Sequence, residues 1–138
     1  MFIRDLNFEV EFSDYCERHF CKDFYRKYSG KQWLETKKTI IDTLKRAFMV
    51  QQTSLIDILM YSQEDNFGIF KFDFKVAGTN LSPKRSGNRV IFSLCNSTGK
   101  IRILLVYAKD HCSKKGTETQ WIFGHIKDAF PEYRKHCK

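Results

Sequence analysis

Residues 87–111, "GNRVIFSLCNSTGKIRILLVYAKDH", contain two apolar runs separated by four turn residues, and they decide the fold of this chain. Asn96 to Gly99 supply the turn, because asparagine and serine favour turns and glycine tolerates a positive φ. Both runs are almost wholly apolar in their middle, which is typical of strands covered on both faces. The stretch therefore predicts a central β-hairpin, in which Cys95 faces Lys100 and Arg89 falls opposite Val106. In that register Arg89 and Tyr107 would point to opposite faces of the sheet.

Alternation of apolar and polar residues predicts two further strands. Residues 8–12 alternate between apolar and acidic side chains, and residues 70–76 place Lys71, Asp73 and Lys75 on the face opposite the phenylalanines. Residues 54–62 are apolar and fit a helix turn and a strand equally well. Residues 77–87 have the composition of a loop, which carries the cationic pair Lys84 and Arg85.

Helical spacing predicts an N-terminal helical hairpin and a C-terminal helix. Cys16, Phe20, Phe24 and Tyr28 recur every four residues, and a second apolar stripe runs from Trp33 to Phe48. A capping-box spacing of Thr117 and Gln120 begins the last helix, and Pro131 ends it. Residues 131–138 are expected to fray. The sequence thus predicts a single α+β domain over residues 1–138, with about four antiparallel strands packed against the helical hairpin.

Composition limits the classes of partner. The formal net charge is +8, which favours nucleic acid or an acidic protein as the partner. The five cysteines contain no C-x-x-C pair, and Met1 to Asp5 lacks the apolar core of a signal peptide. We therefore expect a cytoplasmic protein with free thiols and no membrane span. Cys16, His19 and Cys21 do not share one helix face and have no fourth ligand at a usual spacing, so neither a metal nor another cofactor is expected.

Taken together, these segments resemble the RelE/ParE superfamily of bacterial toxins from toxin–antitoxin systems. The resemblance covers residues 8–130 and implies a RelE-like fold. It is carried by "FEVEFSDYCERHF" as first strand and helix, "FKFDFKV" as second strand, "GNRVIFSL" as third strand, "KIRILLVYAK" as fourth strand and "GTETQWIFGHIKDAF" as last helix. The chain is longer than compact members of the family. It also has Asp110 where ribonuclease members often carry another basic residue.

The resemblance implies an endoribonuclease, an mRNA interferase that cleaves messenger RNA free or on the ribosome without a metal. In that reaction the ribose 2′-hydroxyl attacks phosphorus, so cations must stabilise the growing charge and other groups must move protons. Arg89 and Lys109 match family positions for the phosphate site, and Tyr107 and His111 are candidates for proton transfer. Lys71, Lys75, Lys84 and Arg85 are candidates for binding RNA. Each also has a structural interpretation: solvated cations, or, for Tyr107, a core side chain.

Two other functions remain open from the sequence. A ParE-like toxin would inhibit DNA gyrase without cutting RNA, and a catalytically weak member would only bind RNA or its partner. In each case the resemblance implies a cognate antitoxin, a small acidic protein that would cover the basic surface. Cations around Arg89 favour the nuclease, whereas their absence there favours the ParE-like action.

Overall fold

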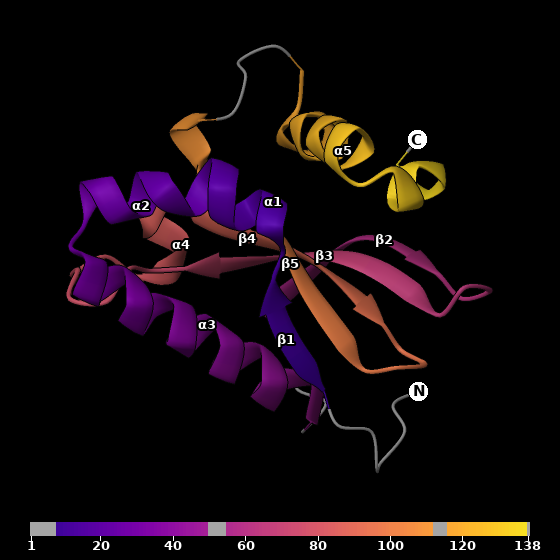
Figure 1. The fold of residues 1–138 in the computed structure, drawn as a ribbon, viewed down its shortest axis with the longest axis horizontal. Helices are drawn as coiled ribbons and strands as arrows, with labels where there is room; N and C mark the ends of the chain where they lie inside the picture. Colours follow the sequence, from indigo (N-terminus) through magenta and orange to yellow (C-terminus); the bar gives the residue numbers. More distant parts are fainter. Residues whose placement is uncertain (1–7, 50–54, 112–115, 138) are drawn as a thin grey trace.

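The computed structural model describes residues 8–49, 55–111 and 116–137, and it is an α+β fold built on one mixed sheet (Figure 1). The sheet has the order β1-β5-β4-β3-β2. Its strands are β1 (Glu9–Phe12), β2 (Ile56–Ser62), β3 (Phe67–Phe74), β4 (Asn88–Cys95) and β5 (Lys100–Ala108). The strand β2 comes from the ambiguous residues 54–62, and it forms one edge of the sheet.

The expectation of a purely antiparallel sheet was wrong. The pairs β2–β3, β3–β4 and β4–β5 are antiparallel, but β1 runs parallel to β5. Consecutive strands joined by short turns must be antiparallel, whereas β1 and β5 are separated by most of the chain, so no turn constrains their direction. Alternation within residues 8–12 predicts a strand but carries no information about the direction of its partner.

The helices cover both faces of the sheet. Figure 1 shows α3 (Gly30–Met49) on one side and α5 (Glu118–Ala129) with the 3₁₀ turn η3 (Pro131–His136) on the other. The first predicted helix is three consecutive segments, α1 (Asp14–Cys16), the π-helical turn η1 (Glu17–Cys21) and α2 (Lys22–Lys27). Within the predicted loop, α4 (Pro83–Ser86) forms one turn, and the 3₁₀ turn η2 (Lys109–His111) follows β5. None of the helices in the described ranges has the length and apolar character needed to cross a bilayer.

The hairpin has the predicted turn, but its register changes halfway along. Cys95 pairs with Lys100 as expected, whereas Arg89 pairs with Tyr107 and not with Val106. The shift lies between Ile91, opposite Leu105, and Phe92, opposite Ile103, which leaves one extra residue in β5. Arg89 and Tyr107 consequently share a face, contrary to the expectation. A bulge inside a continuous apolar run leaves no polarity signal, because every neighbouring residue is equally apolar.

Aromatic rings fill the layers between the sheet and the helices. On the α3 face, Phe48 contacts Phe70 and Phe92, with ring centroids 6.1 and 6.0 Å apart. On the α5 face, Trp121 lies 4.7 Å from Tyr107. The C-terminal segment is not frayed as predicted, because Tyr133 packs 4.7 Å from Phe67 and Cys137 is fully buried. A basic tail can be ordered when its apolar side chains complete the core.

Gly124→Ala is expected to stabilise the protein by about 0.5–1 kcal/mol, because glycine in a helix interior loses more conformational entropy on folding than alanine. A Cβ added at Gly124, within α5, meets no atom within 4 Å, so the methyl group causes no clash. Urea denaturation measures the change. Gly68→Ala is the matched contrast: its Cβ would lie 2.7 Å from the ring of Phe70, and we expect a loss of stability. A destabilised Gly124→Ala variant would contradict the prediction.

Candidate functional site

The predicted cations gather at the end of the sheet where β3 and β5 finish and β4 begins. Arg89 on β4 pairs with Asp73 of β3 and with Tyr107 of β5, and Lys71 precedes Asp73 on the same face. Lys75 follows β3 directly and is exposed. The exposed Lys84 and Arg85 lie on α4, which is anchored to this end because the Ser86 hydroxyl donates to the Phe74 carbonyl at 2.6 Å. The backbone N–H of Lys109 donates to the Gly87 carbonyl at 2.7 Å.

Arg89 itself is enclosed by two carboxylates. Its Nη1 lies 3.1 Å from Asp73 Oδ1, and its Nε lies 3.7 Å from Glu118 Oε2. The Tyr107 hydroxyl donates to the same Glu118 oxygen at 2.6 Å, so the tyrosine and the arginine share one acid. The Arg89 side chain is only 11% exposed, and Tyr107 is fully buried under Trp121. Arg89 can stabilise an anion here only if that anion competes with the protein's own carboxylates.

Glu118 is the neighbour of Arg89 that the sequence interpretation missed. Glu118 is the first residue of α5, where the helix dipole favours a carboxylate. This local effect is enough to explain a glutamate at that position, so the sequence gives no sign of a contact with Arg89. Its position beside Arg89 depends on how α5 crosses the sheet and on the β5 bulge that turns Tyr107 toward it. Asp73 was predicted to share the face of Lys71, and the strand pairing confirms that alternation. Neither acid could be connected to Arg89 from spacing alone.

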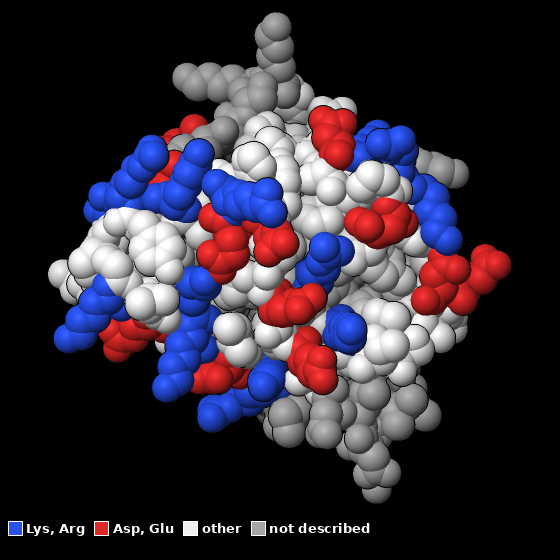
Figure 2. Space-filling model, viewed as in Figure 1, with Lys and Arg blue, Asp and Glu red and all other residues white. Residues whose placement is uncertain are grey.

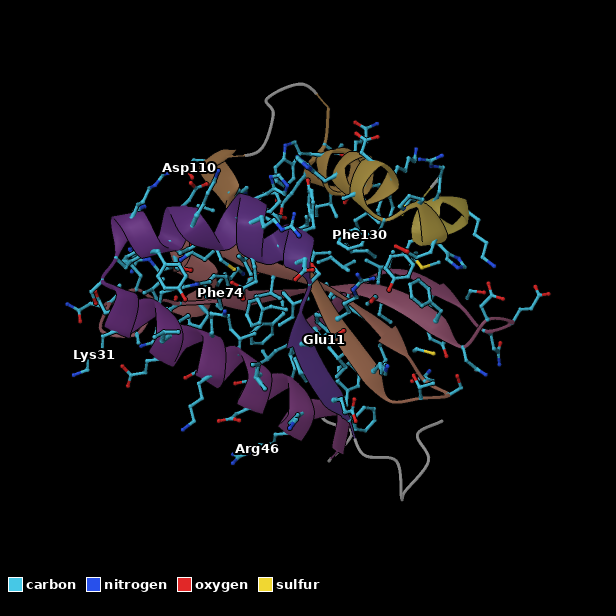
Figure 3. All side chains as sticks on the ribbon, viewed as in Figure 1. Glu11, Lys31, Arg46, Phe74, Asp110 and Phe130 are labelled. Atoms are coloured by element: carbon cyan, nitrogen blue, oxygen red, sulfur yellow. The ribbon has the colours of Figure 1, made fainter. Side chains whose placement is uncertain are left out.

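Lys109 lies on a different part of the surface from Arg89. With Lys27, Asn88 and Asp110 it lines a hollow of about 430 Å³ between α2 and the end of β5, and Arg89 does not line this hollow. A second hollow of about 450 Å³ shares Lys27, Asn88 and Ala108 with the first. Figure 3 shows Asp110 at the turn after β5. The backbone of His111 lies in the same turn, and its side chain is outside the described residues.

Cations and acids are mixed over the surface. In Figure 2, Lys and Arg gather over α2 and α3, with Asp and Glu interspersed between them. The basic helices are therefore not a surface of one sign on this face. Among the described residues no group of three His, Cys, Asp or Glu side chains is placed to hold a metal ion.

We expect Cys95 to be the most reactive of the four cysteines that the described ranges contain. The Ser97 hydroxyl, whose Oγ is 3.2 Å from the Cys95 Sγ, and then the Thr98 hydroxyl lower the pKa of this thiol, so more thiolate is present near neutral pH. Burial raises the pKa of the Cys16 thiol well above its usual value, and burial also raises the pKa of Cys137. Alkylation by iodoacetamide at pH 7 should modify Cys95 roughly ten times faster than Cys16.

Peptide mass spectrometry measures each cysteine separately. The rate at Cys95 should rise with pH until its lowered pKa is passed and then level off. Ser97→Ala should raise the pKa of Cys95 and slow its alkylation at pH 7, while Thr39→Ala on the exposed face of α3 should leave it unchanged. Equal rates at Cys95 and Cys16 would contradict the prediction.

Comparison with protein-family models, with curated proteins and with solved structures finds no match to this chain in any of the three.

Proposed function

We propose that this chain is a RelE/ParE-like toxin that acts as a metal-independent endoribonuclease on messenger RNA in the cytoplasm. One observation carries the proposal: cations from three separate segments lie at the end of the sheet that carries Arg89, with Lys109 lining the hollow next to Asn88. Lys71 and Lys75 come from β3 and its end, Lys84 and Arg85 from α4, and Lys109 from the end of β5. A polyanion crossing this end could be bound at several phosphates.

The order of the elements supports the same proposal. An N-terminal strand, two helical segments, a run of antiparallel strands and a C-terminal helix follow one another as the resemblance implies. The α+β class agrees with the proposal, whereas the fifth strand and the parallel pairing of β1 with β5 depart from the layout that was expected. The segments quoted for the resemblance occupy β1 with α1, β3, β4, β5 and α5, and each has the predicted type of structure.

The residues divide the chemistry between them in this proposal. The Arg89 guanidinium, once free of Glu118, would bond two oxygens of the phosphorane that forms when the 2′-hydroxyl attacks. The exposed lysines and Arg85 would hold the neighbouring phosphates. Tyr107 is too deeply buried to touch RNA, and it acts by positioning Glu118 through their 2.6 Å hydrogen bond. We assign proton transfer to His111 and Lys109, which follow the end of β5.

The antitoxin in this proposal is an acidic protein that covers the cations at the end of the sheet. Opposite charges speed association and favour the correct partner. A net charge of +8 on the toxin suits such a partner and also suits RNA.

One observation favours the alternative of a ParE-like toxin or of a weak nuclease. Asp73 and Glu118 place two negative charges beside Arg89, where a nuclease needs positive charge. In the alternative, Arg89 is a structural residue that joins β3, β4 and α5. Inhibition of DNA gyrase in a supercoiling assay, without new RNA ends, would support it.

The test is to express the protein in bacterial cells, map the 5′ ends of messenger RNA and repeat the mapping with Arg89→Ala. Wild type should arrest growth and produce new 5′ ends, which Arg89→Ala should remove. Lys38→Ala is the matched control, because it removes one exposed cation from α3, which lies on the other side of the sheet from α5. Growth arrest without new ends, or ends that persist in Arg89→Ala, would refute the nuclease.

A further inference from the structure

The contacts of Arg89 differ in how completely they satisfy the guanidinium. Nη1 faces Asp73 at 3.1 Å and also donates to the carbonyl of its neighbour Asn88 at 3.3 Å. Nε is buried and has no hydrogen-bond partner among the described residues, since the nearest carboxylate, that of Glu118, lies 3.7 Å away. A buried donor without an acceptor costs free energy, and an arriving oxygen that accepts its proton removes that cost.

Tyr107 holds the Glu118 carboxylate in a position where it does not hydrogen-bond Arg89. The phenol donates to Glu118 Oε2 at 2.6 Å, a short bond to a charged acceptor, while the same oxygen stays beyond hydrogen-bond distance of Arg89 Nε. The carboxylate thus neutralises the charge of Arg89 without using its donor. An ion pair of this kind is weaker than a bidentate one, because it lacks the directed N–H bonds.

We propose that Glu118 is an internal competitor of phosphate at Arg89, and that single-stranded RNA binds by displacing this carboxylate. This inference rests on the proposed function, because it names the step by which that site becomes available. The displaced partner is Glu118 and not Asp73, since Glu118 is the more distant of the two and belongs to a separate element, α5. Asp73 is fixed directly opposite Arg89 by the pairing of β3 with β4.

The position of α5 sets the strength of this competition. The helix is held to the sheet by the buried Ile122 and Ile126 and by the contact between Trp121 and Tyr107. Glu118 begins the helix beside the Thr117 cap, so it can turn away from Arg89 without breaking the capping box of Thr117 and Gln120. RNA binding would then cost the Glu118–Arg89 ion pair and the hydrogen bond from Tyr107 to Glu118, but not the packing of α5.

The experiment measures binding of a single-stranded RNA with 2′-O-methyl riboses, which lacks the attacking hydroxyl and so reports binding without cleavage. A fluorescent strand of about 12 nucleotides is long enough to cross the end of the sheet. Glu118→Gln removes the charge but keeps an oxygen to accept from Tyr107. It is expected to lower Kd by about fivefold, the scale of a partly exposed ion pair. Glu132→Gln is the matched control. Glu132 is in η3, and its carboxylate lies 3.9 Å from Arg102 of β5 and not beside Arg89.

The outcomes separate this inference from the proposed function. Tighter binding by Glu118→Gln that disappears in the Arg89→Ala/Glu118→Gln double variant supports the competition, whether or not unmodified RNA is cut. Equal binding by wild type and Glu118→Gln, or an equal gain in Glu132→Gln, overturns it, even if wild type cleaves RNA through Arg89. Thermal melting of every variant checks folding, and Glu118→Ala is a second test if the glutamine variant is unstable. If no variant cleaves the unmodified strand and wild type produces no new messenger-RNA 5′ ends in cells, the nuclease proposal alone is overturned.

Discussion

Replacing Arg89 by alanine is expected to lower the rate of RNA cleavage by the purified protein by about 10²–10³-fold, the usual cost of removing one group that stabilises transition-state charge. The effect should be at the upper end of that range. Without the guanidinium, Asp73 and Glu118 remain as two carboxylates at the place where the phosphate must enter, and they repel it.

The variant Arg89→Lys distinguishes the effect of the positive charge from the effect of the planar shape of the guanidinium. Lysine keeps the positive charge but not the planar fork that bonds two phosphate oxygens, so we expect roughly a tenfold loss of rate. Cleavage of a labelled single strand under single-turnover conditions gives the three rates, with Lys38→Ala as the control for net charge. If Arg89→Ala and wild type cleave at the same rate, Arg89 does not contact the reacting phosphate. Circular dichroism must show that each variant retains its secondary structure.

The second large effect concerns stability. Trp33→Ala is expected to lower the free energy of unfolding by about 3–5 kcal/mol, because it removes the largest side chain from the layer between α2, α3 and the sheet. Trp33 is fully buried, and its ring stacks 4.6 Å from Phe24 and lies 6.2 Å from Phe74. The total stability of a domain is about 5–15 kcal/mol, so this change alone could unfold a large fraction of the molecules at 37 °C.

Thermal unfolding followed by circular dichroism measures the loss, which should appear as a fall in Tm of about 10–20 °C. Leu34→Ala is the matched control in the same turn of α3, because Leu34 is 58% exposed and its removal should change stability by about 0.5 kcal/mol at most. Trp33 Nε1 has no hydrogen-bond partner among the described residues, so the loss comes from packing alone. Equal Tm changes for the two variants would contradict this account.

The elements of the fold could be predicted where periodicity was strong. Helical spacing in the stripes containing Phe20 and Phe24, Trp33 and Phe48, and Ile122 and Ile126 matches helices that bury those residues. The turn at Asn96–Gly99 and the pair Cys95–Lys100 were also predictable, because turn chemistry fixes the near end of a hairpin. Residues 54–62 were not predictable, because a short apolar run at a sheet edge has no period that distinguishes a strand from a helix turn.

The site could be predicted only as a set of residue types. Alternation correctly placed Lys71 and Asp73 on one face of β3, whereas Lys75 follows the end of the strand. The bulge in β5 then reversed the expected relation of Arg89 and Tyr107, and α5 brought in Glu118 from 29 positions further along the chain than Arg89. Pairing energies between distant charges depend on distances of a few ångströms, and no local pattern contains those distances.

The sequence by itself determined the α+β class, the central hairpin, the helices and the cationic segments, because each depends on neighbours within a few positions along the chain. Only the tertiary structure decided that β1 is parallel to β5, that the C-terminal segment completes the core, and that Arg89 is paired. The physical reason is the same in all three cases. Burial and ion pairing join residues that are far apart in sequence, and the free energy of such contacts is defined only when the packing of the whole sheet has brought them together.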